Sequence, residues 1–239
     1  MAEIIAHSVD ELADFWAKAV HPFIAPIFEA DSKGQPSPIA SSVLVSRYER
    51  HYLLTAHHVT APIIDSGPQG AQGAFYTFVP EQIQIGGLNH HVTDPFDLSM
   101  TEIPATPPRS LRLPQHLAFD VQESELCLLI GFPARSKSWE FDHTRHTLRP
   151  APLSYLGRVA KKSTARFSVR FDRKHLQRKG RTYSVGKLNG ISGGGAFVLR
   201  NDMPHLAGII IEYHSRSAEI VCTSSVVVWT MAQQIAPLG

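Results

Sequence analysis

The feature that most constrains the fold is a succession of short apolar segments separated by turn-forming residues. The 239-residue chain contains 17 prolines and 16 glycines, spread along its whole length. Turn residues at this density favour short strands over long helices. The segments follow one another without helical patterns between them, which is typical of an all-β sandwich or barrel.

Segments rich in Val, Ile, Leu and aromatic residues are predicted to be strands. They lie at 42–46, 51–55, 73–79, 82–85, 98–103, 126–130, 153–159, 166–171, 195–199, 206–211 and 220–223. A polar turn at 47–50 joins the first two as a hairpin, and four prolines mark 104–118 as a connector between two halves of the chain.

Two helices are predicted, one near each end of the chain. Residues 9–20 follow Ser8 as a candidate N-cap, with Glu11 at the capping-box position and Leu12 on the apolar face. The helix ends before Pro22, and Pro26 is expected to keep the next stretch irregular. A closing helix is predicted at about 226–235.

Composition excludes several classes of protein. A hydrophobic content of 43% and a net charge of +2 exclude disorder of the whole chain, and two cysteines exclude a disulfide scaffold. No apolar run approaches the ~20 residues that a membrane span needs. Because the N-terminus also lacks a basic region followed by an apolar core, no secretory signal is expected and a cytoplasmic location is predicted.

The near-neutral total hides an uneven distribution of charge. Residues 158–187 contain eleven of the 23 Lys and Arg residues and one of the 21 acidic ones, a formal charge of +10 against −8 for the remainder. We interpret this basic segment as a solvated loop and the exposed faces of two strands. A site for an anionic ligand is the alternative, and nucleic-acid binding is not expected because no named module accompanies the charge.

Three short motifs carry side chains suited to acyl transfer. Leu-Thr-Ala-His-His-Val occupies 54–59 at the end of an expected strand, and Phe-Asp-Leu-Ser-Met occupies 96–100 at the start of one. Asn-Gly-Ile-Ser-Gly-Gly-Gly occupies 189–195, before another strand. A serine nucleophile needs a histidine base, an acid that orients the imidazole, and unobstructed backbone N–H groups for the oxyanion. The three motifs together supply these parts.

These motifs resemble those of the chymotrypsin-like (trypsin-like) serine peptidase family, of the intracellular bacterial type. The first is similar to Leu-Thr-Ala-Ala-His and identifies His58, not His57, as the base. The second is similar to Asp-Ile-Ala-Leu and identifies Asp97, and Gly-Ile-Ser-Gly-Gly is similar to Gly-Asp-Ser-Gly-Gly and identifies Ser192. The resemblance also implies an oxyanion hole formed by the N–H groups of Gly190 and Ser192.

Spacing agrees with this resemblance. His58 and Asp97 lie 39 residues apart, and Asp97 and Ser192 lie 95 apart. The chymotrypsin triad has the same order, with gaps of about 45 and 93 residues. Any one motif would be weak evidence, but three in this order are strong evidence when taken together.

The resemblance implies an all-β fold of two antiparallel β-barrels with an N-terminal helical extension and a C-terminal helix. The expected division is an extension at 1–38, a first barrel at 39–115 and a second barrel with the closing helix at 116–239. The first barrel would carry His58 and Asp97, and the second Ser192.

The sequence departs from the family pattern at several positions. Ile191 replaces an aspartate that binds a newly freed N-terminal amine in secreted members, so activation by N-terminal insertion is not expected. The oxyanion loop is then either preformed or ordered by a partner protein.

Four further positions are expected to form the substrate pocket. Gly186 lies where trypsin carries the acid that selects Lys and Arg, and Ile211 lies where the family commonly has a serine bonded to the catalytic aspartate. Glu212 recovers selectivity for basic residues if it points inward, and Tyr213 either narrows the pocket or is a bulky edge residue.

Other interpretations of the same residues fit less well. A nucleophile elbow of the α/β-hydrolase type needs an acid and a histidine after the serine, and only 47 residues follow Ser192. A phosphate-binding loop fails because no Lys-Ser/Thr follows the glycines. Asp142, His143 and His146 lack a persuasive metal-ligand pattern, so no metal is expected. Cys127 and Cys222 lie in apolar strands and are expected to be buried.

The sequence therefore predicts a serine endopeptidase that works through a Ser-His-Asp triad without a cofactor. Its expected partners are a protein or peptide substrate and, as an option left open, a regulatory protein, with no nucleic acid and no membrane. The alternative is a catalytically quiet binding module that uses the cleft or the basic segment at 158–187.

Overall fold

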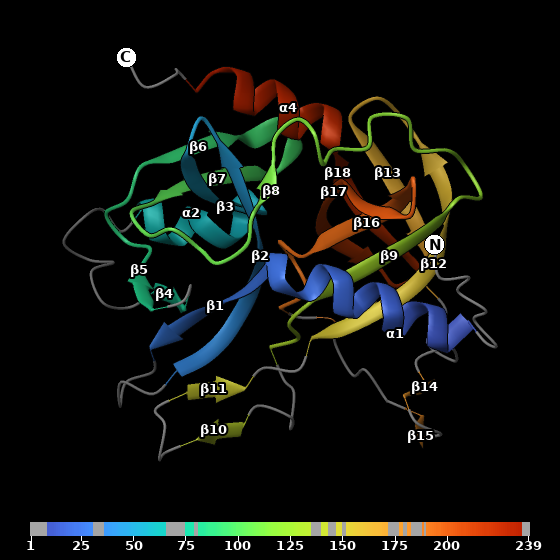
Figure 1. Cartoon of the computed structure of the whole chain (residues 1–239), viewed down its shortest axis with the longest axis horizontal. Coiled ribbons are helices and arrows are strands. Elements are labelled where there is room, and N and C mark those ends of the chain that lie inside the picture. Colours follow the sequence, from blue (N-terminus) through green and yellow to red (C-terminus); the bar gives the residue numbers. More distant parts are fainter. Residues whose placement is uncertain are drawn as a thin grey trace.

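A computed structural model describes most of the chain. The described residues are 9–30, 36–65, 75–78, 81–134, 140–142, 147–149, 152–171, 177–178, 181–182, 188 and 190–235. They form two β units with helices at both ends, and Figure 1 shows the two units side by side.

The first unit is an eight-stranded sheet with the order β5-β4-β1-β2-β3-β7-β6, in which β8 pairs with β2 in parallel. Its strands are β1 (Ile24–Ala30), β2 (Pro36–Arg47), β3 (Arg50–Thr55), β4 (Phe75–Phe78), β5 (Gln82–Gln84), β6 (His90–Thr93), β7 (Leu98–Ile103) and β8 (Leu111–Arg112). The helix α2 (His57–Asp65) begins directly after β3.

The second unit is a closed antiparallel barrel with the order β12-β13-β18-β17-β16-β9. Its strands are β9 (Leu126–Gly131), β12 (Leu153–Lys162), β13 (Arg166–Arg170), β16 (Gly195–Arg200), β17 (Met203–His214) and β18 (Glu219–Ser224). Two small hairpins lie outside it, β10 (Glu140–Asp142) with β11 (Thr147–Arg149) and β14 (Gln177–Arg178) with β15 (Arg181–Thr182).

Helices close the two ends of the fold. The helix α1 (Val9–Val20) lies against β9, β12 and β17, so the N-terminal helix packs on the second barrel although it precedes the first unit in sequence (Figure 1). The helix α4 (Ser225–Gln233) contacts β17, β18 and β6, and therefore touches both units. None of the described helices is long and apolar enough to cross a membrane.

The structure confirms the all-β class and the chymotrypsin-like arrangement of a barrel beside a second sheet. The expectation of irregular chain after Pro26 is wrong, because this segment is β1 and pairs with β2. Proline is tolerated there because β4 pairs with β1 only at Phe28 and Glu29, so no ladder bond is lost on that side at Pro26. The Pro26 carbonyl accepts a hydrogen bond from Thr77 Oγ1 at 2.7 Å.

Sequence analysis also missed α2 and β6. The apolar periodicity of α2 is weak, and Pro62 lies inside the helix, so its pattern gave little helical signal. The missed strand β6 begins with two histidines and pairs with β7 over four residues, from His90–Thr101 to Thr93–Leu98. Its residues are partly exposed, so no run of apolar residues marked it.

One apolar cluster spans both units and holds them together. Val43 and Leu54 from the first sheet pack with Ile130 and Ile209 from the barrel, and all four are fully buried. The helices α1 and α4 cover the same cluster with Val20 and other residues. Since burial of apolar area is the main favourable term in folding, this shared core fixes how the two units meet.

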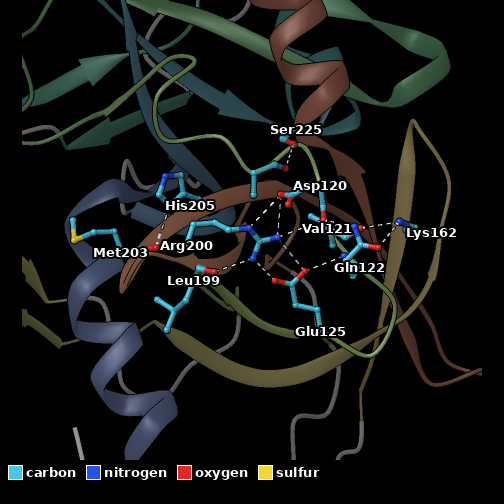
Figure 2. Close-up of polar contacts among 11 residues, drawn as sticks. Asp120, Val121, Gln122, Glu125, Lys162, Leu199, Arg200, Met203, His205 and Ser225 are labelled. Carbon is cyan, nitrogen blue, oxygen red and sulfur yellow. Dashed lines mark hydrogen bonds and ion pairs between the residues drawn. The ribbon is translucent and has the colours of Figure 1, made fainter. Parts of the chain in front are cut away.

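A cluster of charged and polar groups fastens residues 120–125 to the second barrel (Figure 2). Arg200, at the end of β16, donates to Asp120 Oδ1 at 3.1 and 3.2 Å and pairs with the Glu125 carboxylate. Lys162 donates to the Val121 carbonyl and to Gln122 Oε1 at 3.2 and 3.0 Å. The segment before β9 is therefore held by contacts from two barrel strands.

Arg200→Met is expected to destabilise the protein by about 1–3 kcal/mol, because the partly buried Glu125 carboxylate loses its charged partner. Arg216→Met is the matched control, since Arg216 is exposed and makes no ion pair or hydrogen bond among the described residues. Urea unfolding midpoints of the two variants give the comparison. Equal midpoints would show that the cluster in Figure 2 contributes nothing to stability.

Candidate active site

The loop that carries Asp97 is bent sharply before β7. Residues Asp94–Phe96 form the 3-10 helix η2, and Asp97 follows it in the left-handed region with φ 51° and ψ 51°. The Asp97 N–H donates to the Asp94 carbonyl at 3.0 Å. Aspartate tolerates this conformation better than most residues, and backbone strain of this kind is concentrated at functional sites.

The Asp97 carboxylate meets the first turn of α2. Its Oδ1 accepts the His58 backbone N–H at 2.8 Å, and its Oδ2 lies 2.7 Å from His58 Nδ1. The Asp97 carbonyl accepts the His57 N–H at 3.1 Å. The imidazole of His58 is therefore held by the carboxylate that also caps the start of its helix, an arrangement that fixes its orientation.

These contacts shift both titrating groups. The hydrogen bond to Asp97 raises the pKa of His58 above its ordinary value of 6.5, against the effect of burial, and the charges of Asp97 and Glu212 add to it. Burial alone would raise the pKa of Asp97, but hydrogen bonds from the His58 ring and N–H outweigh burial and lower it. The neighbouring His57 points elsewhere, with its Nδ1 2.6 Å from Asp94 Oδ1.

Side chains from the second barrel hold the loop that carries Asp97. Thr223, on β18, donates from Oγ1 to the Phe96 carbonyl, and Arg166, on β13, donates to the Pro95 carbonyl at 3.0 Å. Ile211, which the family resemblance places at the position of a serine donor to Asp97, has a side chain that is 3% exposed and packs in the apolar cluster of the first sheet. Among the described residues, the donors to the Asp97 carboxylate are the backbone N–H and the imidazole of His58.

The turn that carries Ser192 is pressed against β2 and the end of β9. Gly193 has φ +84°, and a Cβ there would lie 2.0 Å from the Ser41 carbonyl oxygen and from Thr55 Oγ1. Gly190 has φ +91°, and a Cβ there would lie 2.3 Å from the Ala134 nitrogen. Both positions require glycine, since any side chain would collide with the backbone or with a buried hydroxyl.

Ser41, on β2, is a hydrogen-bond centre that sequence analysis missed. Its side chain is completely buried, and its Oγ donates to the Gly190 carbonyl at 2.8 Å while accepting the Phe132 N–H at 2.7 Å. Its own N–H donates to the Ser192 carbonyl at 2.9 Å. One residue of the first sheet thus fixes two carbonyls of the turn. Ser41 and Ser42 are adjacent in an apolar strand, and nothing in the sequence pattern indicates that Ser41 has this role.

Ile191 anchors the same turn from the barrel side. Its side chain is 3% exposed and lies in the apolar core of the barrel, beside Ala196 and Leu129. Its N–H donates to the Leu188 carbonyl at 3.2 Å, and the Gly194 N–H returns to the Ile191 carbonyl at 2.9 Å. Apolar packing of Ile191 therefore holds the turn on this side.

The Ser192 hydroxyl donates to the Ile211 carbonyl at 3.2 Å, and it makes no hydrogen bond to His58 in the described structure. A register shift between Ile210 and Glu212 in the β17–β18 pairing leaves Ile211 outside the ladder. Within the described residues, the N–H groups of Gly190 and Ser192 donate to no acceptor, whereas those of Gly193 and Gly194 are both bonded. Two unpaired donors therefore flank the hydroxyl.

A cavity of about 450 Å³ brings His58, Gly190 and Ser192 together. Its remaining wall comes from the first sheet and α2, through Glu29, Ile39, Ala40, Val59, Pro62 and Phe75. This volume lies in the range of small-molecule and peptide-side-chain sites. A base held by a carboxylate, a hydroxyl and two unpaired N–H donors at one cavity are the parts that acyl transfer requires.

None of the expected pocket residues is among the described residues that line the cavity at Ser192. Gly186 is outside the described residues. Glu212 is half exposed and pairs with His214 at 2.8 Å, and Tyr213 packs edge-on against Phe171 with ring centroids 5.5 Å apart. With Ile211 buried in the core, none of the three described residues lines the cavity at Ser192.

Several described cations of the basic segment make contacts within the protein. Arg158 donates to the Ser124 carbonyl at 2.8 Å, Lys161 pairs with Glu219 at 3.2 Å, and Lys162 and Arg166 make the contacts given above. Much of 172–187 lies outside the described residues. The described part supports the structural interpretation of this charge.

The remaining candidates are the two cysteines and the group of Asp142, His143 and His146. Cys127 and Cys222 are fully buried free thiols, and burial raises the pKa of both, as expected for small apolar residues. His143 and His146 lie outside the described residues, as does the side chain of Asp142. Within the described chain, no three His, Cys, Asp or Glu residues are grouped to hold a metal ion.

Comparison with known proteins supports the fold. No protein-family model matches the sequence, and no curated protein matches it significantly. The crystal structure of the MamO protease domain from Magnetospirillum magneticum, in its apo form, superposes with a TM-score of 0.54. The match covers 91% of this chain and 98% of that one at 13% identity. The chain therefore has the fold of a protease domain of the chymotrypsin-like type.

The His58 pKa is expected to fall in Asp97→Asn, because the substitution removes the hydrogen bond and the charge that raise it. Glu212→Gln should lower the pKa of His58 by a smaller amount. Asp65→Asn, which changes an exposed carboxylate on the same helix, is the control and should leave it unchanged. Titration of the imidazole by NMR measures all three, and an unchanged pKa in Asp97→Asn would contradict the geometry.

Ser41→Ala is expected to loosen the turn at 190–194, because the Gly190 carbonyl and the Phe132 N–H lose their buried partner. A loss of about 1–2 kcal/mol corresponds to roughly ten-fold faster amide exchange at Ile191, Gly193 and Gly194. Ser42→Ala removes an equally buried hydroxyl that donates to the Ala25 carbonyl instead, and serves as the control. Equally fast hydrogen exchange in both variants would show that Ser41 has no specific role in holding this turn.

Proposed function

We propose that the protein is a serine endopeptidase in which Ser192 is the nucleophile, His58 the general base and Asp97 the residue that orients the base. The observation that carries this proposal is the single cavity shared by His58, Ser192 and Gly190, with the His58 ring held by Asp97. The protease fold and the family resemblance of the three motifs agree with it.

The reaction follows from the chemistry of these groups. Ser192 attacks the peptide carbonyl, and His58 Nε2 takes its proton while Nδ1 remains on Asp97. The oxyanion accepts hydrogen bonds from the N–H groups of Gly190 and Ser192. His58 then returns the proton to the leaving amine, and water hydrolyses the acyl-enzyme by the same steps.

His58 acts as a base only when its imidazole is neutral. Its raised pKa means that kcat/KM rises with pH through a value above 6.5 and levels off when the ring has lost its proton. The charge of Asp97 favours the imidazolium that forms during attack, so the same contact that raises the pKa stabilises the transition state.

The hydroxyl of Ser192 must turn before it reacts. In the resting arrangement it donates to the Ile211 carbonyl, and one rotation about χ1 redirects the hydroxyl of a serine side chain. The turn itself is held by Ser41 and Ile191 without help from another chain, which supports a preformed oxyanion loop rather than one ordered by a regulatory partner.

A second candidate function is a catalytically quiet binding module that uses the same cleft. The observation that favours it is the hydrogen bond from Ser192 to Ile211 in place of one to His58. The intact set of His58, Asp97 and Ser192 favours the enzyme. Reaction with a fluorophosphonate separates the two, because it requires an activated hydroxyl.

The full-length protein is expected to react with a fluorophosphonate promptly and in one-to-one ratio, with loss of labelling in Ser192→Ala. Peptide hydrolysis by Ser192→Ala should fall by about 10⁴-fold or more, and Asp97→Asn should approach the same loss. Ser163→Ala, at an exposed turn, is the control. Intact mass spectrometry gives the labelling ratio, and a wild-type protein that never reacts would favour the quiet binding module.

A further inference from the structure

The cavity at Ser192 extends well beyond the groups that perform the chemistry. Besides His58, its described lining includes Val59 and Pro62 of α2, and Ile39 and Phe75 on two strands of the first sheet. Glu29 also lines it and is the one carboxylate among its described lining residues. A cavity lined by both apolar side chains and a single carboxylate is suited to a ligand with an apolar part and one cation.

The chemistry indicates which part of a substrate would occupy this space. His58 must deliver its proton to the leaving amine, so the leaving group lies on the side of the imidazole. Apart from the turn at 190–192, the described lining of the cavity comes from α2 and the first sheet and includes no residue of β17. Its occupant is therefore the segment that follows the scissile bond.

Glu29 is placed to select the charge of that segment. It lies near the end of β1, where it pairs in register with Ser37 on β2 and Phe75 on β4. It is exposed, and it makes no hydrogen bond or ion pair with any described residue. A carboxylate that lacks a described partner and borders an apolar cavity attracts a Lys or Arg side chain and repels an acidic one.

Glu212 differs from Glu29 both in having an ion-pair partner and in its position relative to the cavity. It pairs with His214 at 2.8 Å, and it does not line the cavity. Its charge acts on His58, so a substitution there changes the base as well as any substrate contact. Glu29 is therefore the position at which selectivity can be tested apart from the chemistry.

We propose that this cavity binds the leaving-group side of a peptide substrate and that Glu29 selects a basic residue within the first three positions after the scissile bond. Apolar walls from Ile39, Val59 and Phe75 hold an uncharged side chain beside that residue. This inference rests on the proposed peptidase function, but it concerns a different part of the site and can fail independently.

The test uses internally quenched peptides that differ only in carrying Lys, Gln or Glu at each of the first three positions after the scissile bond. The wild type is expected to cleave the best Lys peptide about three- to ten-fold faster in kcat/KM than its Glu counterpart. Glu29→Gln should abolish this preference, and Glu29→Lys should invert it. The preference should also shrink between 50 mM and 500 mM salt, because an exposed carboxylate is screened.

Glu123→Gln is the matched control, since Glu123 is exposed in the segment before β9 and does not line the cavity. It should keep the wild-type preference. The fluorophosphonate rate of each Glu29 variant is measured alongside, and the charge preference is taken as the ratio of kcat/KM for the Lys and Glu peptides, in which a uniform change of activity cancels. Cleavage that is indifferent to charge at all three positions would overturn the inference and leave the peptidase function intact.

Binding to Ser192→Ala gives an independent result. Fluorescence anisotropy with the same Lys and Glu peptides should show tighter binding of the Lys peptide, and this difference should disappear when Glu29→Gln is added. A charge preference in binding without any cleavage by the wild type would support the cavity assignment and refute the peptidase. Equal binding of both peptides would refute the cavity assignment.

Discussion

The arrangement of the site depends on the hydrogen bonds that Ser41 makes across the junction of the two β units. Its hydroxyl holds the Gly190 carbonyl and the Phe132 N–H, and its own N–H holds the Ser192 carbonyl. Ser41 is fully buried, so an unmade bond there would carry the whole cost of desolvation. At the same junction Gly193 lies too close to β2 for any Cβ, because a Cβ there would lie 2.0 Å from the Ser41 carbonyl oxygen.

A second set of contacts runs in the opposite direction. Thr223 and Arg166 of the barrel hold the carbonyls of Phe96 and Pro95, next to Asp97 of the first unit. Each unit therefore fixes the part of the site that the other unit contributes. The apolar cluster shared by the two units lies beneath both sets of contacts. Packing in this core, rather than contacts at the surface, therefore sets the relative position of the units.

The resting site combines an oriented base with a nucleophile that is turned away from it. Asp97 raises the pKa of His58 and fixes its ring, whereas the Ser192 hydroxyl rests on a carbonyl that a register shift has left outside the β17–β18 ladder. Ile191 anchors the turn by apolar packing in the barrel core, so this contact does not depend on charge. The one carboxylate among the described residues that line the cavity is Glu29.

Sequence by itself determined the fold class and most strands, because alternating apolar segments and turn residues act locally; the segment 98–103, for example, was predicted with the bounds of β7. Motifs and their spacing also identified His58, Asp97 and Ser192 as candidates. The elements β1 and α2 were not predicted because Pro26 and Pro62 lie within them. Sequence could not indicate Ser41 or Glu29, since each acquires its role from residues distant in the chain: Ser41 and Gly190 are 149 positions apart. Only the tertiary structure decided which residues line the cavity, because a side chain's neighbours across a sheet junction depend on how two units pack and not on local pattern.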